Sequence, residues 1–336
     1  MANIADVAKA AGVSASTVSY VLSGKRTISK ETADRVHRAI REMDYRPNAG
    51  ARALASARTN IIGLVVPLRA GQNVPVVMEF VAAVVTRARS HDHDVLLLTQ
   101  DEGVDGLRRV AASALVDALI VMDVQAKDPR LTALRSLDTP AVLIGVPERS
   151  TGLSAVDLDF AAAGSRAIEH LAELGHRRIG FIGQPPKVYE RGTGYAERLL
   201  TGLHTAAAEH DVTLSVAPCE SSMAGLRASV TQLLDEQPGL TALIVHNESV
   251  LPALREVLLE RERRLPDDVA VVAICPDDMA SSHGIDYTNI AIPADELGTA
   301  AVDMVMSRLP GKNSAETRLL APDLTVRDTT PDLKAR

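Results

Sequence analysis

Five polar residues stand where an α/β protein binds small ligands. Asn247 ends the apolar run ALIVHN, and Asp277 follows the apolar run VAVVAI. An amide both donates and accepts hydrogen bonds, and a carboxylate accepts them, which suits the hydroxyl groups of a ligand. Arg191 and Arg198 flank the start of the helical segment after RIGFIG, where a guanidinium can clamp a polyol or a carboxylate. Together with Asp159, at the start of an earlier helix, these residues predict a binding site for a small molecule.

Catalytic motifs are weak by comparison. The run GFIG at 180–183 lacks the full dinucleotide fingerprint, and neither GxxxxGK[ST] nor GxSxG occurs. The run HDHD at 91–94 lacks a convincing third metal ligand, and the paired carboxylates of Asp277 and Asp278 have no companion base or nucleophile. Cys219 and Cys275 show neither metal-ligand spacing nor a disulfide framework. We therefore predict no catalytic residue, no metal and no cofactor, and a protein that is not an enzyme.

The elements that must position the five polar residues alternate along the chain from residue 61 onward. Apolar runs typical of buried strands alternate with segments of helical spacing, which predicts parallel sheets in an α/β architecture. The expected strands are 61–66, 94–99, 118–123, 141–146, 178–183, 214–217, 242–247 and 269–274. The expected helices are 75–90, 103–115, 160–174, 194–210, 223–236, 248–263 and 294–308. Two sets of strands are visible, and ligands bind at the carboxyl ends of such strands.

The N-terminal segment has a different pattern. Apolar residues recur at helical spacing up to Ala11, and Gly12 then supplies a tight turn. A second helix, capped by Ser14 or Ser16, and a third helix, capped by Ser29, are expected to complete a small core. The small and polar outer face of the second helix suits the major groove of DNA.

Charge is divided unevenly between this segment and the rest of the chain. Residues 1–60 contain ten Lys and Arg against five Asp and Glu, whereas the whole chain has a net charge of −7. The head therefore carries +5 and the remaining residues carry −12. A polyanionic partner fits the first segment and is repelled by the second.

A short segment follows the third helix. Pro47 disfavours helical geometry at Arg46, and the residues from Asn48 to Ser56 then predict a helix of about two turns. A helix of that length is marginal alone, so it is expected to form only when something holds it. Leu54, its one large apolar residue, is either a core contact or a wedge between base pairs in the minor groove.

Residues 3–58 resemble the head and hinge of the LacI/GalR family of bacterial transcription regulators. The matching residues are IADVAKAAGVSASTVSYVL, the helix from Ser29 to Tyr45, and RPNAGARALA. The match is dense and close to free of gaps, and its order is hard to reach by chance. It predicts a sequence-specific regulator that acts on double-stranded DNA.

The resemblance also implies individual DNA contacts. Ala15, Ser16 and Tyr20 take the base-reading positions of the second helix. Because Ala15 offers only an apolar contact, Ser16 and Tyr20 must carry most of the polar readout. Leu54 takes the minor-groove position with Ala55 beside it. Arg26 is a further candidate for contact with a phosphate or a base. The residues expected to touch phosphate or sugar are Asn3, Ser14, Thr17, Ser19, Ser23, Tyr45 and Asn48.

By the same resemblance, Asp159, Asn247 and other residues of these types line an effector cleft. The family commonly has an arginine three residues before a glycine on one helix, and both Arg191 and Arg198 nearly fit, so that register stays open. The family's short GxDD turn is replaced by AICPDD, which leaves the choice between Asp277 and Asp278 open as well.

The expected fold is a small all-α helix-turn-helix head joined to an α/β body of the periplasmic-binding-protein type, with two Rossmann-like lobes joined by three crossovers. The expected divisions are 1–46 for the head, 47–58 for the hinge helix, 59–158 with 291–325 for the N-terminal lobe, 159–290 for the C-terminal lobe, and 326–336 for a tail.

The expected function is that of a repressor, a homodimer on a palindromic operator in the bacterial cytoplasm, controlled by a small-molecule effector that is a sugar or a derivative. Aromatic residues make up only 2% of the chain, which leaves few platforms for stacking against a sugar. A periplasmic sugar-binding protein and an α/β enzyme with an incidental head are the alternatives. The polar N-terminus and the fused head disfavour the first, and the missing catalytic motifs disfavour the second. Whether the effector releases or recruits DNA binding stays open.

Overall fold

A computed structural model describes most of the chain. The described residues are 2–23, 26–45, 58–69, 71–101, 103–113, 115–149, 152–282, 284–309 and 314–333. Within these segments, no helix combines the length and the apolar character that a membrane span requires.

The first three helices form a core of their own. They are α1 (Ile4–Ala11), α2 (Ala15–Ser23) and α3 (Lys30–Glu42). Val7, Val18 and Val36, one from each helix, are completely buried against one another's helices. Gly12 ends α1 at a φ of 63°, in the left-handed region that glycine enters at low cost.

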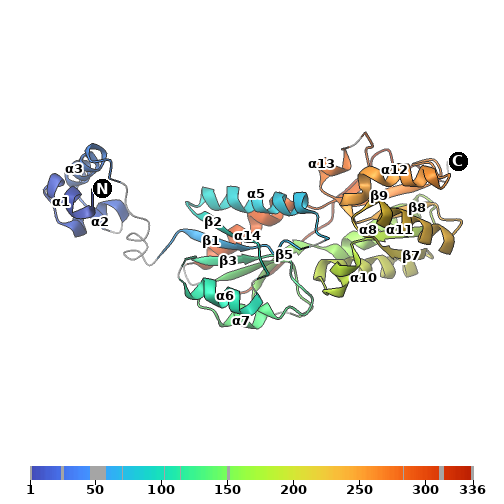
Figure 1. The fold of residues 1–336 in the computed structure, drawn as a ribbon, viewed down its shortest axis with the longest axis horizontal. Coiled ribbons are helices and arrows are strands. Elements are labelled where there is room, and N and C mark those ends of the chain that lie inside the picture. Colours follow the sequence, from blue (N-terminus) through green and yellow to red (C-terminus); the bar gives the residue numbers. More distant parts are fainter. Residues whose placement is uncertain are drawn as a thin grey trace.

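The first α/β lobe is built on a six-stranded parallel sheet with the strand order β11-β5-β4-β3-β1-β2. Its strands are β1 (Ile61–Val65), β2 (Asp94–Leu98), β3 (Ala118–Val121), β4 (Ala141–Ile144), β5 (Ser154–Leu158) and β11 (Thr317–Leu320). Helices α5 (Val74–Ser90) and α14 (Ala294–Arg308) cover one face, and α6 (Gly103–Ala112) and α7 (Arg130–Ser136) cover the other (Figure 1). The central strands β1, β3 and β4 are covered on both faces and apolar throughout, which explains their continuous runs in the sequence.

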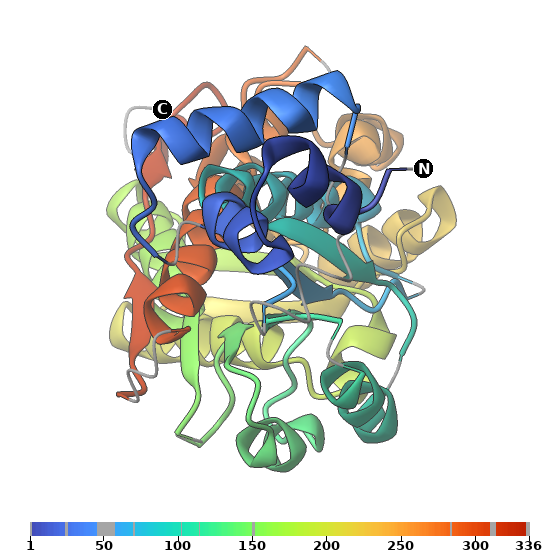
Figure 2. The same cartoon turned by 90° about the vertical axis from the view of Figure 1, so that its left-hand side faces the viewer.

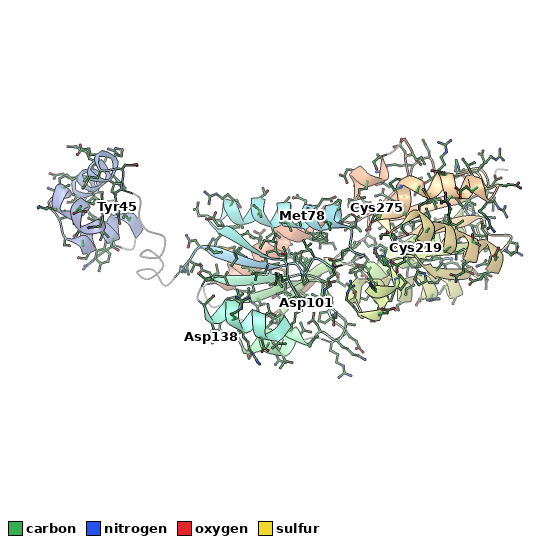
Figure 3. The ribbon with its side chains drawn as sticks, viewed as in Figure 1. Tyr45, Met78, Asp101, Asp138, Cys219 and Cys275 are labelled. Atoms are coloured by element: carbon green, nitrogen blue, oxygen red, sulfur yellow. The ribbon has the colours of Figure 1, made fainter. Side chains whose placement is uncertain are left out.

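The second lobe repeats this plan with the strand order β12-β10-β9-β8-β6-β7. Its strands are β6 (Arg178–Gly183), β7 (Thr213–Pro218), β8 (Ala242–Val245), β9 (Ala270–Cys275), β10 (Thr288–Ala291) and β12 (Leu324–Thr325). Its helices are α8 (Phe160–Glu173), α9 (Pro186–Glu190), α10 (Gly194–Glu209), α11 (Met223–Glu236), the 3-10 helix η1 (Glu248–Val250), α12 (Leu251–Glu260) and α13 (Asp277–Ala280). Figure 2 views the molecule from the end that carries the head, with α1, α2 and α3 in front of the body. Cys219 and Cys275 lie in this lobe as buried free thiols (Figure 3).

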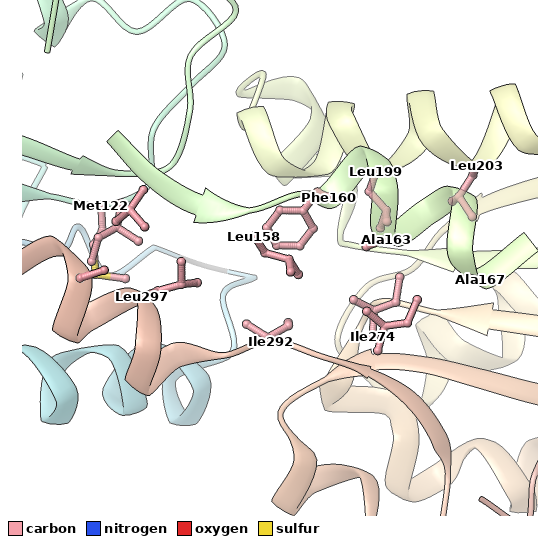
Figure 4. Packing of buried hydrophobic residues seen from close by; sticks show 14 of the residues in the cluster. Met122, Leu158, Phe160, Ala163, Ala167, Leu199, Leu203, Ile274, Ile292 and Leu297 are labelled. Atoms are coloured by element: carbon pink, nitrogen blue, oxygen red, sulfur yellow. The ribbon is translucent and has the colours of Figure 1, made fainter. Parts of the chain in front are cut away.

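One hydrophobic core runs through both lobes where the chain crosses between them. Leu158, Phe160 and Ile292 lie at the crossing and belong to the same buried cluster as both sheets (Figure 4). Farther into the second lobe, α10 packs closely on α8 through Gly202. A Cβ at Gly202 would lie 1.9 Å from the backbone oxygen of Ala161, so only glycine permits this approach.

The end of the chain departs from the expected divisions. Residues 291–325 were expected in the first lobe, but β12 pairs antiparallel with β10 of the second sheet. The expected tail also packs there, because Thr329 Oγ1 donates to the backbone oxygen of Val271 at 2.7 Å. Pro322, just after β11, has no N–H with which to extend that strand, and the chain returns to the second lobe.

Candidate functional site

The head presents one exposed face of α2. Val18 faces the core with no exposed surface, while Ser16 and Tyr20 are exposed on the opposite side and Ala15 is exposed at the start of the helix. Ser14 begins the helix, because its hydroxyl accepts a hydrogen bond from the backbone N–H of Thr17 at 3.1 Å. The three residues expected to contact bases are therefore all exposed on a helix that the major groove can accommodate.

Other predicted DNA contacts surround this face. The Arg26 guanidinium lies 5.7 Å from the centre of the Tyr20 ring, close enough for a cation–π contact. Asn3 caps α1, with its side-chain oxygen accepting from the N–H of Ala5 at 2.8 Å. Thr17, Ser19 and Tyr45 are partly exposed. The Ser23 side chain and the hinge residues Asn48, Leu54 and Ala55 lie outside the described residues.

The body contains a cavity at the carboxyl ends of both sheets. Its volume is about 130 Å³. It lies where β1, β3 and β4 of one lobe and β6 and β8 of the other lobe end, which is the usual ligand position in parallel sheets. The lining residues are Val66, Pro67, Gln72, Asn73, Val76, Val77, Phe80, Met122, Asp123, Val124, Ile144, Gly145, Asp157, Phe160, Gln184, Tyr195, His246, Glu248 and Ile292.

Backbone hydrogen bonds hold the two lobes together beside this cavity. The N–H of Ala126 donates to the oxygen of Gly192 at 2.8 Å, and the N–H of Gly194 donates to the oxygen of Val124 at 3.0 Å. Gln125 and Thr193 form the antiparallel bridge between these bonds. These bonds join the two lobes along one side of the cavity.

Aromatic rings gather on one wall of the cavity. The ring centres of Phe160 and Tyr195 are 5.3 Å apart, and His246 lies 5.8 Å from Phe160 and 5.6 Å from Tyr195. Phe80 contributes a further ring to the lining. The low aromatic content of the chain had suggested few stacking platforms, but the fold concentrates several of the available rings in this cavity.

Three carboxyl groups and an uncharged histidine are among the polar residues of the lining. Burial raises the pKa of Glu248 to about 7, although side-chain hydrogen bonds from Gln184 and Asn73 oppose the shift. Burial also raises the pKa of Asp157 to about 6, against the opposing effect of its ion pair with Arg198. Burial lowers the pKa of His246 to about 3, so this ring is neutral.

Asp123, the third carboxylate, is paired with a cation. Arg69 Nε lies 3.0 Å from Asp123 Oδ2. Neither Arg69 nor Arg198 lines the cavity, so both arginines hold these carboxylates from outside the lined space. Carboxylate oxygens that face such a cavity can accept hydrogen bonds from hydroxyl groups.

None of the five predicted ligand residues is among the described residues that line the cavity. Arg198 contacts two residues that do line the cavity, because it pairs with Asp157 and its guanidinium lies 5.7 Å from the Phe160 ring centre. Asp159 instead caps α8, accepting from the N–H of Ala162 at 3.0 Å.

Two glycines of α10 approach neighbouring backbone closely, since a Cβ at Gly194 would lie 2.9 Å from the oxygen of Val146 and one at Gly202 would meet Ala161. Gly202 is the glycine that α10 needs against α8, and the residue three positions earlier is Leu199, which is buried in the core (Figure 4). Arg198 is therefore four residues before Gly202, one position earlier than the family's arginine would be. Arg191 precedes α10, and its Nε and Nη2 are buried with no hydrogen-bond partner among the described residues.

Asn247 and Asp277 are engaged within the second lobe. The Asn247 amide donates to the oxygen of Cys219 at 2.7 Å, so it fixes the loop that carries its lining neighbours on either side. Asp277 accepts from the Asn289 amide at 3.0 Å and from Arg327 at 3.2 Å. Pro276 separates Asp277 from the end of β9, which places both consecutive aspartates in α13 and outside the lining.

Comparison with known proteins agrees with this two-part construction. Residues 3–48 match the lacI family of bacterial regulatory proteins, and residues 168–330 match the periplasmic binding protein-like domain. The transcriptional regulator CelR of Thermobifida fusca is 31% identical over 96% of this chain and 96% of its own length. A structure of a CelR–cellobiose complex has a TM-score of 0.68 and 26% identity, covering 98% of this chain and 100% of that one. A lac repressor dimer bound to operator and an anti-inducer has a TM-score of 0.83 at 24% identity, covering 98% and 99% of the two chains.

The fold and the exposed helical face define a DNA-binding transcription regulator whose body has the fold of a periplasmic binding protein. The chain belongs to the lacI family of bacterial regulatory proteins, and it is a regulator of transcription and not an enzyme.

Proposed function

We propose that this chain is a dimeric repressor that binds a palindromic operator and responds to a carbohydrate effector in the cavity between its lobes. The observation that carries the proposal is the joining, in one chain, of an exposed recognition helix and a cavity with aromatic and carboxylate walls. The CelR relative in complex with cellobiose supports a carbohydrate as the effector. The class of the relatives supports action in the bacterial cytoplasm.

The first lobe offers a surface suited to a second copy. Strand β2 is the edge of its sheet, and Leu97 on this strand is 37% exposed. On the adjacent helix α5, Val74 and Val85 are each 44% exposed. Burying these apolar side chains against the same face of another copy would place two heads side by side, as a palindrome requires.

Within each head, Ala15, Ser16 and Tyr20 would contact bases. Another set would contact phosphate or sugar: Asn3, Ser14, Thr17, Ser19, Ser23, Arg26, Tyr45 and Asn48. Leu54, with Ala55 beside it, would enter the minor groove from the hinge. Because the hinge helix would form only when it is paired with its partner and bound to DNA, the body can control DNA binding through the position of the hinge.

The effector would act through the lining and through the residues behind it. Arg198 orients Asp157, and Asn247 fixes the loop that carries Glu248. Asp159, Arg191 and Asp277 would contribute by holding the lobe surfaces around the cavity. Ligand binding would change the relative positions of the lobes and thereby the spacing of the two hinges.

Selection of genomic fragments by the full-length chain, followed by footprinting at several salt concentrations, tests the proposal. We expect a protected site with two-fold symmetry. Binding that lacks sequence preference at every salt concentration would contradict it, because phosphate contacts alone give such non-specific binding.

A further inference from the structure

One buried carboxylate holds the point at which the chain enters the first lobe from the expected hinge. Asp117 Oδ1 accepts from the backbone N–H of Thr59 at 2.7 Å and from the hydroxyl of Thr59 at 2.9 Å. Asp117 Oδ2 accepts from the backbone N–H of Asn60 at 2.8 Å, and Nε2 of the buried His93 lies 3.8 Å from the same oxygen. The side chain of Asp117 is only 8% exposed, so water competes little for these three hydrogen bonds.

The backbone turns at Asn60, immediately before β1 begins. Asn60 has a φ of 56°, in the left-handed region that asparagine enters more readily than most other residues. Its carbonyl oxygen accepts from the N–H of Asp94, the first residue of β2, at 2.9 Å. The hydroxyl of Thr59 accepts in turn from the N–H of Ile61, the first residue of β1, at 3.2 Å. Because Asp117 directly precedes β3, the starts of all three strands hold this turn together.

Two of these strands lead from the turn to the cavity. Strand β1 enters the first lobe at the end that faces the head and runs toward the second lobe (Figure 1). Val66, directly after β1, and Met122, directly after β3, both line the cavity. The two strands pair in parallel, and the five residues of β1 separate the turn from the cavity by roughly 17 Å at about 3.3 Å per residue. A shift at the cavity end therefore reaches the turn through one hydrogen-bonded unit.

We infer that Asp117 is a positioning residue for DNA binding, because it fixes the end of the hinge to the strand pair that leads to the cavity. This inference rests on the proposed function and names the residue through which the body controls the hinge. When the lobes shift, the strand pair would carry Thr59 and Asn60 with it, and the hinge is joined directly to these residues. Without the three hydrogen bonds, the end of the hinge can move independently of the strand pair.

An amide cannot satisfy all three donors at this position. Asparagine has one acceptor oxygen and one NH2 group, so in Asp117→Asn the NH2 group would face an N–H of Thr59 or Asn60. The variant therefore loses at least one hydrogen bond with almost no change in size. Thr59→Val removes the hydroxyl and keeps the branched shape, whereas Thr59→Ser retains the hydroxyl. Asp268→Asn is the control, because Asp268 accepts from the N–H of Arg264 at 2.8 Å in the second lobe.

Fluorescence anisotropy titration of the full-length chain with its selected operator and with a scrambled duplex of the same length tests the inference. Asp117→Asn and Thr59→Val should each lower the ratio of the two affinities about 5- to 30-fold, the cost of ordering the backbone of one residue on binding. Thr59→Ser and Asp268→Asn should leave the ratio unchanged. Because the contact acts as one unit, combining Asp117→Asn with Thr59→Val should lower the ratio no further than Asp117→Asn alone.

The ratio separates a positioning role from a structural one. A variant that has only lost stability binds both duplexes more weakly by the same factor, and its ratio does not move. A sugar supplies the second measurement, and the probe is the one among glucose, galactose, ribose, maltose and cellobiose that raises the Tm of the unchanged chain. The change that this sugar causes in operator affinity should be smaller in Asp117→Asn than in the unchanged chain.

The outcomes for the variants and for the unchanged chain are distinct. An unchanged ratio in both Asp117→Asn and Thr59→Val overturns the role of Asp117, and so does an equal loss in Asp268→Asn. Either result leaves the proposed function intact, since the unchanged chain still prefers its operator. Equal binding of operator and scrambled duplex by the unchanged chain would overturn the proposed function itself, and this inference with it.

Discussion

Replacing Glu248 by glutamine should make the body more stable at alkaline pH and change little at acidic pH. Burial raises the pKa of this carboxyl from 4.5 to about 7. A carboxyl with a raised pKa favours the folded state when protonated, and this advantage is lost as pH rises from 4.5 through 7. Because a tenfold change in proton affinity corresponds to about 1.4 kcal/mol, the ionised group costs the folded state about 3 kcal/mol above pH 7.

Glutamine keeps the size of the side chain and one acceptor oxygen, but it never ionises. The free energy of unfolding should therefore be higher for the variant by up to about 3 kcal/mol at pH 8, with the gain falling toward zero at about pH 4.5. Urea unfolding of both proteins at half-unit steps of pH measures this difference directly. Comparing the two proteins removes the contribution of every other titrating group that they share.

The same substitution at Glu260 is the control. Its exposed ion pair with Arg227 lowers the pKa of Glu260, so Glu260→Gln should give no stability gain at pH 8. If Glu248→Gln lowers stability by the same amount at every pH, the carboxyl acts only through its hydrogen bonds, and the explanation by burial is wrong.

Three further predictions concern the hinge, the helix packing and the arginine beside the cavity. Leu54→Ala should weaken specific DNA binding in a gel-shift assay far more than it lowers Tm, whereas equal loss of both would indicate a core contact. Gly202→Ala should lower the free energy of unfolding by about 1–3 kcal/mol or prevent folding, because its Cβ would lie 1.9 Å from the oxygen of Ala161, and an unchanged urea midpoint would refute this packing. Arg198→Met should lower stability more at pH 8 than at pH 5, because Asp157, with a pKa raised by burial to about 6, can be protonated at the lower pH; an equal loss at both pH values would contradict the ion pair's role.

Much of the fold could be predicted because buried parallel strands leave continuous apolar runs. The runs beginning at 61, 118 and 242 coincide with β1, β3 and β8. Strand β5 (Ser154–Leu158) was missed, since it is short and carries a buried aspartate that breaks the apolar run. Strand β12 (Leu324–Thr325) has two residues and no pattern, and only its pairing with β10 reveals its lobe.

Two of the five predicted ligand residues, Asn247 and Asp159, lie one or two positions away from the lining. Asn247 was chosen where Glu248 and His246 line the cavity, and Asp159 was chosen where Asp157 and Phe160 do. Position after a strand identifies the correct edge of the sheet, but the direction of each side chain depends on the twist of the chain as it leaves the strand. The aromatic wall had no signal in the sequence, because its rings come from α5, α8, α10 and the loop after β8.

The DNA face could be predicted more fully. Its residues lie on a single helix, so spacing alone places Ser16 and Tyr20 on the side opposite Val18, and Ala15, Ser16 and Tyr20 are all exposed in the structure. The cation–π contact between Arg26 and Tyr20 spans a turn whose path the sequence does not define.

The most direct test of regulation by the cavity is the affinity of the full-length chain for its selected operator, measured with and without the sugar that stabilises it. We predict a change of about 5- to 150-fold, the usual size of coupling between two sites, and its loss in the Glu248→Gln variant. An affinity for the operator that stays the same with the cavity saturated would contradict control of the head by the body.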